Sequence, residues 1–346
     1  MVQETSLGGG DFFTKTYDLV GCLEDAEDMI HVLITGAGGF LGQRLVSSLL
    51  AQGRLGGQAI GRITLADRRL PELPNAKGVE IVGREGDLSD RAYLAALVAD
   101  GFDALFHFAS LLTIEAEQNS GLAWDVSVES LRYLIETAEG APKVIYASSI
   151  AIFGGALPEE VGDDVVPLPQ TTYGTQKAIC ELLIADHSRL GRIDGCCLRL
   201  PIVVTRPGAP AAAISDRVAG ILREPLTGHD LAAPLAPETP VPIVSAGAAI
   251  SAFLTLVDLP AEALPPKRAF NLPALTVTVA EMVAAGVRKG AKGAVTYAPD
   301  TQVQRIVDGW PRRFTSVAAA RLGIGPDTDI EAVIDDFQSQ KESHNG

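Results

Sequence analysis

The sequence predicts an α/β protein: a doubly wound parallel sheet with a smaller, mixed lobe formed by the C-terminal part of the chain. Two observations support this prediction. Short apolar runs rich in β-branched residues alternate with stretches of helical periodicity between residues 30 and 190. The first run, residues 31–35, leads into a glycine-rich turn, after which apolar residues recur at helical spacing. Strand, tight turn and helix in this order form half of a βαβ unit.

The glycine-rich turn has the spacing of a dinucleotide phosphate site. Its glycines are Gly36, Gly39 and Gly42. The first permits a sharp turn, the second lets backbone N–H groups approach a phosphate, and the third lets the following helix pack against the sheet. The helix N-terminus then offers N–H groups and a positive dipole end to a pyrophosphate. A turn without a ligand is the alternative, and the flanking strand and helix make it the weaker one.

An acid at the end of the second predicted strand, residues 63–67, bears on the choice of cofactor. A carboxylate at the position of Asp67 accepts hydrogen bonds from an adenosine ribose and repels a 2′-phosphate, which favours NAD over NADP. Arg68 and Arg69 follow at once and could attract that phosphate. Asp67 could also be an ordinary turn acid, so the choice stays open here.

The predicted sheet continues with apolar runs that end in small residues. Strands are expected at 79–82, 103–110 and 143–149, and helices at 93–98 and 121–139. Ser89 or Asp90 is the expected N-cap of the first of these helices. Small residues at the carboxyl end of a strand suit a ligand that lies across the edge of the sheet.

A tyrosine and a lysine four residues apart are the first candidates for catalysis. Residues 154–172 are rich in proline and acids and are interpreted as a solvated surface loop. The helix that follows places Tyr173 and Lys177 on one face. A nearby ammonium stabilises a phenolate, which lets tyrosine accept a proton near neutral pH. A hydroxyl such as that of Ser149 could bind the reacting oxygen.

Three segments, residues 35–42, 148–154 and 173–177, resemble the extended short-chain dehydrogenase/reductase superfamily, also called the NAD-dependent epimerase/dehydratase superfamily. The resemblance spans about residues 29–206. It implies a Rossmann-type sheet, NAD as the cofactor, and a catalytic set in which Ser149 binds the substrate oxygen, Tyr173 is the general acid/base and Lys177 assists it. The cofactor contacts it implies are Gly36, Gly39, Phe40, Leu41, Gly42, Asp67, Asp87, Leu88, Phe108, Ala109, Ser110, Tyr173, Lys177 and Pro201.

Within this superfamily the chain is most similar to the D-erythronate dehydrogenase subfamily. The similar segments are 173–183, 199–201, 205–208, 221–226 and 309–311. The subfamily implies NAD-dependent oxidation of a four-carbon sugar acid at its C2 hydroxyl, from D-erythronate to 2-dehydro-D-erythronate.

Arg206 is the candidate for binding the substrate carboxylate, because a guanidinium can hold it with two hydrogen bonds. A surface or structural role for this arginine is the alternative. The chain departs from the superfamily pattern at Ser127, where members usually carry Asn, and at 239–247, which is apolar where polar substrate contacts are expected.

Two other functions remain open. A nucleotide-sugar epimerase or dehydratase on the same fold would keep NAD tightly bound and would need a diphosphate pocket. No suitable Asn or basic pair follows Pro201 to build one. A non-catalytic NAD-binding scaffold would usually lack the tyrosine or the lysine, and both are present.

The composition excludes several classes of partner. A formal net charge of -15 argues against nucleic acid and anionic membrane surfaces. No uncharged apolar run reaches the roughly 18 residues of a membrane span. The four cysteines and five histidines lack metal-ligand spacing, so no metal is expected. The cysteines are expected to be buried free thiols in a reducing, cytoplasmic compartment.

The predicted division is an NAD-binding domain at 29–206, with a return at about 243–258, and a substrate lobe at 207–242 and 259–346. Residues 1–28 carry no signal-peptide pattern and are expected to be a poorly ordered extension. The helices at 121–139 and 173–187 carry apolar residues on more than one face. Such helices pair with their copies in the resembled superfamily, so a homodimer is expected.

Overall fold

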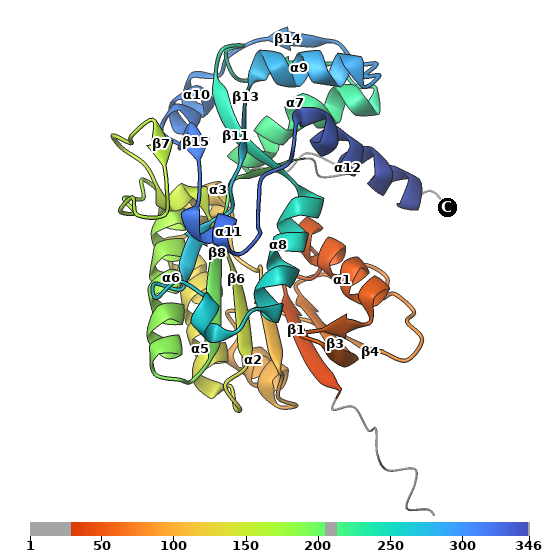
Figure 1. Ribbon diagram of the computed structural model, residues 1–346, viewed down its shortest axis with the longest axis vertical. Helices are drawn as coiled ribbons and strands as arrows, with labels where there is room; N and C mark the ends of the chain where they lie inside the picture. The colour runs from red at the N-terminus through yellow and green to blue at the C-terminus, as the bar shows by residue number, and fades with distance from the viewer. Residues whose placement is uncertain (1–28, 205–212, 345–346) are drawn as a thin grey trace, which may run out of the picture.

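The computed structural model describes residues 29–204 and 213–344, with side chains as far as residue 340. Figure 1 shows a large α/β unit with a smaller lobe above its sheet. The predicted N-terminal extension and Arg206 lie outside the described residues. The predicted domain boundaries stay predictions.

The main sheet confirms the predicted fold class. Its eight strands run in the order β12-β8-β6-β5-β1-β3-β2, with β4 also paired to β3. All pairs are parallel except β2 with β3. The strands are β1 (Ile30–Thr35), β2 (Arg54–Leu55), β3 (Gln58–Asp67), β4 (Glu80–Glu85), β5 (Ala104–His107), β6 (Lys143–Ser149), β8 (Asp194–Leu200) and β12 (Ala269–Asn271).

Helices cover both faces of this sheet. Alternate strand residues divide between two cores: Ile34 and Phe106 belong to one, Leu33 and Leu105 to the other. The first core lies under α1 (Phe40–Gln52) and α8 (Ala246–Asp258). The second lies under α2 (Arg91–Val98), α3 (Thr113–Gln118), α4 (Ser120–Trp124), α5 (Ser130–Thr137) and α6 (Thr172–Arg189).

The helix expected at 121–139 is interrupted. A π-helical turn, Asp125–Glu129, separates α4 from α5 and contains Ser127. Periodicity predicts helix through this segment, and a single widened turn leaves that pattern nearly unchanged. The N-cap of α2 is Asp90, whose carboxylate accepts a hydrogen bond from the Ala92 N–H at 2.8 Å.

The smaller lobe contains the short sheets β13-β11-β9 and β10-β14 around a third hydrophobic core, and the two-stranded sheet β15-β7 contributes to a fourth, smaller core. The strands are β7 (Glu160–Val161), β9 (Ile202–Val204), β10 (Leu231–Ala233), β11 (Pro240–Ser245), β13 (Leu275–Thr278), β14 (Val295–Tyr297) and β15 (Arg313–Phe314). The helices are α7 (Ile214–Thr227), α9 (Val279–Arg288), α10 (Thr301–Asp308), α11 (Val317–Arg321) and α12 (Ile330–His344).

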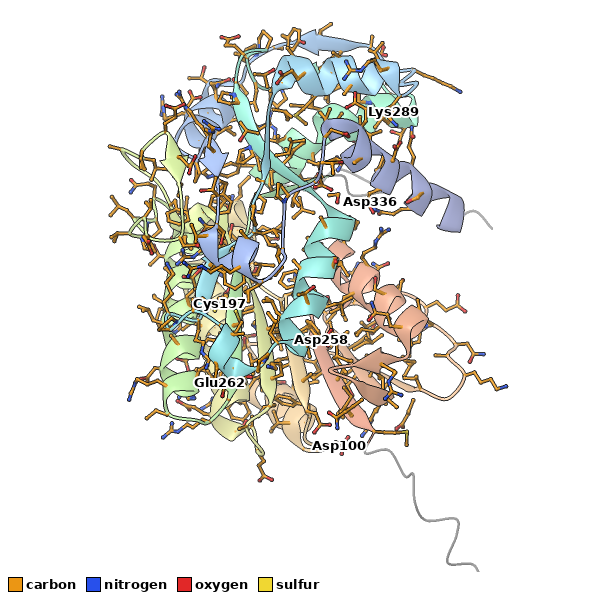
Figure 2. The ribbon with its side chains drawn as sticks, in the orientation of Figure 1. Asp100, Cys197, Asp258, Glu262, Lys289 and Asp336 are labelled. Carbon is orange, nitrogen blue, oxygen red and sulfur yellow. The ribbon has the colours of Figure 1, made fainter. Side chains whose placement is uncertain are left out.

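The chain passes between the large unit and the smaller lobe more than once. After β11 the chain returns to the main sheet as α8, which packs on α1, and then as the edge strand β12, before it re-enters the lobe. Arg44 of α1 forms an ion pair with Asp336 of α12 at 2.6 Å, and Figure 2 shows where Asp336 lies on α12. The Asp336 carboxylate also accepts the Gly247 N–H at 3.1 Å.

The acidic loop at 154–172 was expected to be a solvated surface loop, but part of it is buried in the folded protein. Its β7 pairs with β15, and Val161 is fully buried. Asp163 accepts hydrogen bonds from the Asn271 N–H, the Ser316 hydroxyl and the Ala318 N–H at 3.0, 2.9 and 3.1 Å. This acid is therefore part of the folded structure because three donors from the C-terminal segments need an acceptor there.

Candidate functional site

A cavity of about 380 Å³ opens at the carboxyl ends of the parallel strands. The glycine-rich turn, the ends of β5 and β6, the first turns of α6 and α7, and the link between β8 and β9 form its walls. It brings together these residues singled out from the sequence: Gly36, Gly39, Phe40, Leu41, Gly42, Phe108, Ser110, Ser149, Tyr173, Lys177 and Pro201. The roles assigned to them stay predictions.

The glycine-rich turn has the geometry of an anion cradle. Gly36 has a φ of 73°, a left-handed conformation that few other residues adopt. A Cβ on Gly42 would overlap the Gly36 carbonyl oxygen and come within 2.7 Å of the Ala37 Cα. No side-chain hydrogen bond caps α1 at Gly39, so the N-terminus of this helix faces the cavity without an anionic cap. These features fit the pyrophosphate of a dinucleotide.

Sequence reasoning missed Gly38. A Cβ there would overlap the Arg69 carbonyl oxygen and lie 3.2 Å from the Asp67 carboxylate. The Gly38 N–H donates to Asp67 Oδ2 at 2.9 Å, and the Arg68 N–H donates to Oδ1 at 2.7 Å. The doubled glycine at 38–39 was the available signal. Asp67 therefore shapes the turn from behind and does not line the cavity.

Three further predicted contacts lie outside the cavity wall. Asp87 accepts from both the N–H and the hydroxyl of Ser89, at 2.9 and 2.8 Å, and these bonds lower the pKa of its carboxyl. Leu88 is buried in the core beneath α2. The backbone of Ala109 lies against Gly36, where a Cβ would come within 2.7 Å of the Ala109 nitrogen.

The candidate catalytic residues are held by a close helix-to-strand contact. Ser149 ends β6, and its hydroxyl oxygen accepts the Ala151 N–H at 3.1 Å. Tyr173 lies in the first turn of α6, which Thr171 caps by accepting the Gly174 N–H at 3.0 Å. A Cβ on Gly174 would overlap the Ala151 carbonyl oxygen. This glycine lets the start of α6 reach the turn that follows Ser149.

Lys177 is buried one helical turn beyond Tyr173. Its ammonium donates to the Ala147 carbonyl oxygen at 2.7 Å. The same nitrogen lies 5.5 Å from the centroid of the Tyr173 ring and 4.6 Å from that of Tyr146. The Lys177 side chain is thus fixed beside the ring of the candidate acid/base.

Two buried side chains behind this pair each carry one polar atom that has no partner in the described part of the chain. The Ser127 hydroxyl makes no hydrogen bond to a described residue, although the Ser127 carbonyl accepts the Cys180 thiol at 3.4 Å. His107 Nδ1 bonds the Thr35 hydroxyl at 2.8 Å, and its Nε2 has no partner among the described residues. Burial and the charge of Lys177 lower the pKa of His107 to about 3, so this imidazole is neutral.

The cavity wall also includes Thr113, Ser215, Asp216 and Trp310. Sequence reasoning gave none of them a role, although the last three come from the segments predicted to form the substrate lobe. Asp216 forms an ion pair with Arg223 at 2.8 Å within α7. Lys177 is the sole cation among the described lining residues. Only Trp310 had a signal, as part of the similar segment 309–311.

Other features of the described chain bear on excluded functions. Cys180, Cys196 and Cys197 are buried free thiols, and Figure 2 shows where Cys197 lies in the interior. The described residues contain no cluster of His, Cys, Asp or Glu suited to a metal ion. None of the helices within 29–204 and 213–344 combines the length and apolarity that a membrane crossing needs.

Comparison with known proteins places this site in a family. The sequence profile of the NAD dependent epimerase/dehydratase family matches residues 32–259. D-erythronate dehydrogenase of Cupriavidus necator is 41% identical over 316 residues, 88% of this chain and 97% of the relative. D-erythronate dehydrogenase of Haemophilus influenzae is 37% identical over 314 residues, 89% of this chain and 98% of the relative.

A solved structure agrees with the fold. The nucleoside-diphosphate-sugar epimerase from Agrobacterium tumefaciens superimposes with a TM-score of 0.83 at 33% identity and covers 88% of this chain and 92% of its own. The glycine cradle, the parallel sheet and these matches lead to one assignment. The chain belongs to the NAD dependent epimerase/dehydratase family, the extended short-chain dehydrogenase/reductases that its motifs resemble.

Proposed function

We propose that this protein is an NAD-dependent dehydrogenase that oxidises the C2 hydroxyl of a four-carbon sugar acid, D-erythronate, to 2-dehydro-D-erythronate. One observation carries the proposal: Ser149, Tyr173 and Lys177 line the same cavity as the uncapped N-terminus of α1. The relatives named D-erythronate dehydrogenase support the choice of substrate.

The chain's residues divide the chemistry as follows. The nicotinamide, when bound, supplies the hydride acceptor. Tyr173, as a phenolate beside the Lys177 ammonium, takes the proton of the substrate hydroxyl. Ser149 holds the same oxygen by a hydrogen bond and keeps the reacting carbon in line. The glycine turn and the α1 N-terminus would bind the pyrophosphate of the cofactor.

The substrate end of the cavity supports a small, hydroxyl-bearing substrate. Thr113 and Ser215 offer hydroxyls, and the Asp216 carboxylate can accept a hydrogen bond from a substrate hydroxyl. A carboxylate substrate needs a cation there. We propose Arg206 for this role, because a guanidinium can hold a carboxylate with two hydrogen bonds.

Replacing Tyr173 tests the mechanism. Tyr173→Phe should lower kcat for D-erythronate by roughly 10²- to 10⁴-fold, because the proton acceptor is lost. The Kd for NAD should change little, since the ring and Lys177 remain. Tyr133→Phe on α5, outside the cavity, is the matched control and should retain full turnover. A Tyr173→Phe enzyme with normal turnover would refute the assignment.

A second candidate function is a nucleotide-sugar epimerase, favoured by the similarity to the Agrobacterium tumefaciens structure. The two functions differ in redox balance. A dehydrogenase forms net NADH from an aldonate, whereas an epimerase returns the hydride to its sugar and forms none. Absorbance at the NADH band, scanned over aldonates and UDP-sugars, separates them.

Three finer features complete the proposal. Asp67 supports NAD over NADP as the preferred cofactor, and buried free thiols support a reducing, cytoplasmic location. A homodimer is supported by the exposed apolar side chains of Leu182 on α6 (72% exposed) and Trp124 on α4 (40%). Light scattering tests the dimer, and a monomer would refute it.

A further inference from the structure

A row of buried polar side chains crosses three strands beside the candidate catalytic residues. Ser148 of β6 and Asn271 of β12 are each register partners of Arg199, which lies on β8 between them. Register partners on parallel strands point to the same face of a sheet. Ser148 is 2% exposed, Asn271 is 0% exposed and Arg199 is 3% exposed, so the row is closed to solvent.

Helix α6 places a carboxylate over this row. Glu181 follows Lys177 by four residues and Tyr173 by eight, and therefore lies on the same helix face. Its Oε1 accepts from the Ser148 hydroxyl at 2.6 Å and from Arg199 Nε at 2.9 Å, and its Oε2 accepts from Arg199 Nη2 at 2.8 Å. One carboxylate thus fixes α6 to both β6 and β8.

The arrangement favours geometry over stability. The attraction within a buried ion pair offsets little of the free energy needed to remove two charges from water, so apolar side chains of similar size often give a fold of equal stability. A two-pronged guanidinium–carboxylate contact, in contrast, sets distance and angle together. Here the guanidinium contact sets the helix that carries Tyr173 and Lys177 against β8, and the Ser148 hydroxyl links the same carboxylate to β6, the strand that ends in Ser149.

We propose that Glu181 and Arg199 are positioning residues for the reaction, which hold Tyr173 at its working distance from Ser149. The proposal rests on the function proposed above. Neither residue lines the cavity, so each acts through its neighbours. Ser148, which does line the cavity, is the link between the ion pair and the catalytic strand.

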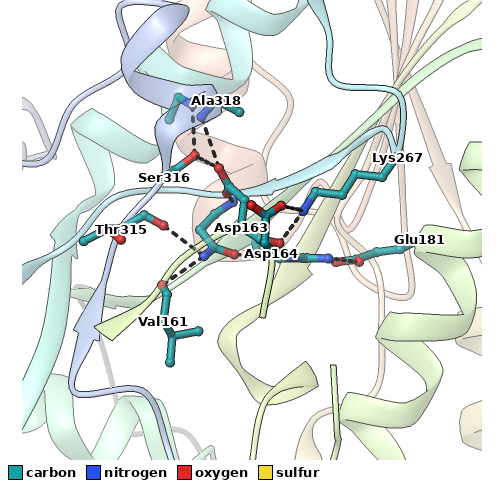
Figure 3. A network of polar contacts seen from close by, with 11 residues as sticks. Val161, Asp163, Asp164, Glu181, Lys267, Thr315, Ser316 and Ala318 are labelled. Carbon is teal, nitrogen blue, oxygen red and sulfur yellow. Dashed lines mark hydrogen bonds and ion pairs between the residues drawn. The ribbon is translucent and has the colours of Figure 1, made fainter. Parts of the chain in front are cut away.

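The same row reaches the substrate lobe. Arg199 Nη1 lies 3.4 Å from Asn271 Oδ1, and Asn271 Nδ2 donates to the carbonyl oxygens of Val161 and Thr315 at 3.2 and 3.0 Å. Figure 3 shows this continuation, in which Asp163 then accepts from Ser316. Thr315 and Ser316 follow Trp310 closely in the chain, so the row connects the catalytic strand to the segment that carries Trp310 into the cavity wall.

A double substitution separates positioning from folding. Glu181→Leu with Arg199→Met removes both charges together and avoids stranding one of them in the core. We expect a folded protein whose kcat falls roughly 10- to 100-fold, the range expected for a misplacement of about 1 Å. The KM for NAD should stay within about twofold, because the cofactor cradle is untouched. With substrate deuterated at the reacting carbon, the isotope effect on kcat should rise as hydride transfer becomes slower.

Ser148 supplies a second, milder test. Ser148→Ala removes the hydroxyl that joins Glu181 to β6 and should lower kcat severalfold. Ser148→Thr keeps the hydroxyl and should restore it. Lys143→Met is the matched control, since the Lys143–Asp194 ion pair (2.5 Å) joins the same two strands at their opposite ends. This control should leave both kcat and the isotope effect unchanged.

The outcomes are distinct. A folded Glu181→Leu/Arg199→Met enzyme with kcat and isotope effect like the wild type would overturn the positioning role. If the double variant does not fold, equal kcat for Ser148→Ala and Ser148→Thr would overturn it. An active Tyr173→Phe enzyme would instead refute the proposed function itself.

Discussion

Gly38 offers a sharp test of the turn geometry. In Gly38→Ala the new methyl group would overlap the Arg69 carbonyl oxygen, well inside the 3.4 Å at which such contacts become ordinary. The turn must shift, and the shift breaks the 2.9 Å bond from the Gly38 N–H to Asp67. Overpacking costs about 1–3 kcal/mol and a hydrogen bond to a charged group about 1.5–3 kcal/mol, so we expect a loss of roughly 3–5 kcal/mol.

Gly39→Ala is the matched comparison. Its Cβ would meet a single atom, the Gly36 carbonyl oxygen, at 3.1 Å, and the backbone there is extended with a φ of -74°. The fold should lose less than about 1 kcal/mol. The methyl would nevertheless stand at the N-terminus of α1, where the pyrophosphate is proposed to bind, and NAD affinity should fall at least about tenfold.

Thermal unfolding and NAD titration read the two effects separately. Gly38→Ala should lower the Tm by roughly 10 °C and weaken NAD binding, whereas Gly39→Ala should weaken binding with the Tm nearly unchanged. A Gly38→Ala protein that melts like the wild type would show that the Arg69 carbonyl does not close the space behind the turn. A larger Tm loss for Gly39→Ala would reverse the assignment of the two glycines.

Three further predictions concern single side chains. Asp67→Asn keeps an acceptor for Gly38 but removes the charge, so the ratio of kcat/KM for NADP to that for NAD should rise about tenfold, and an unchanged ratio would remove Asp67 from cofactor selection. The pKa of His107 is about 3 in the folded protein and 6.5 when the chain is unfolded, so its contribution to the free energy of unfolding is present above pH 6.5 and is lost as the pH falls toward 3. About 2 kcal/mol of that free energy should be lost at pH 5, and urea unfolding of His107→Gln should show a weaker dependence of stability on pH below 6.5. Asp336→Ala removes the acceptor of Arg44 and of the Gly247 N–H and should cost about 2 kcal/mol in the same assay, whereas wild-type stability would argue against a tie between α1 and α12.

Most of the main sheet could be predicted from the sequence because its strands are buried on both faces. Such strands give nearly continuous apolar runs, as at 31–34 and 144–147, and the loops between them carry capping residues such as Asp90. The turn at Gly36 was equally visible, because its glycine spacing is local. Signals of this kind need no knowledge of distant contacts.

The features that were missed depend on contacts between distant segments. From the sequence, Asp163 is interpreted as a solvated acid, because its hydrogen bonds to Asn271, Ser316 and Ala318 form only in the folded chain. The close approach at Gly38 comes from Arg69, which belongs to the next strand and its turn. A single sequence carries no record of such pairings, so local composition favours the surface interpretation.

The part of the cavity wall proposed to contact the substrate shows the same limit. Thr113, Asp216 and Trp310 come from three segments that lie far apart in the chain. None of them belongs to a local motif with a known chemical role. The π-helical turn at Ser127 leaves the apolar period of its helix almost intact, so periodicity alone could not reveal it.

The woven path of the chain has a consequence for its synthesis. Strand β12 completes the edge of the main sheet beside β8, yet it is made only after the first part of the lobe and after α8, the helix that packs on α1. A nascent chain on the ribosome therefore exposes the β8 edge until about three quarters of the protein has emerged. The main sheet therefore cannot be completed before the first part of the lobe is made, and the lobe cannot be exchanged between relatives as one continuous segment.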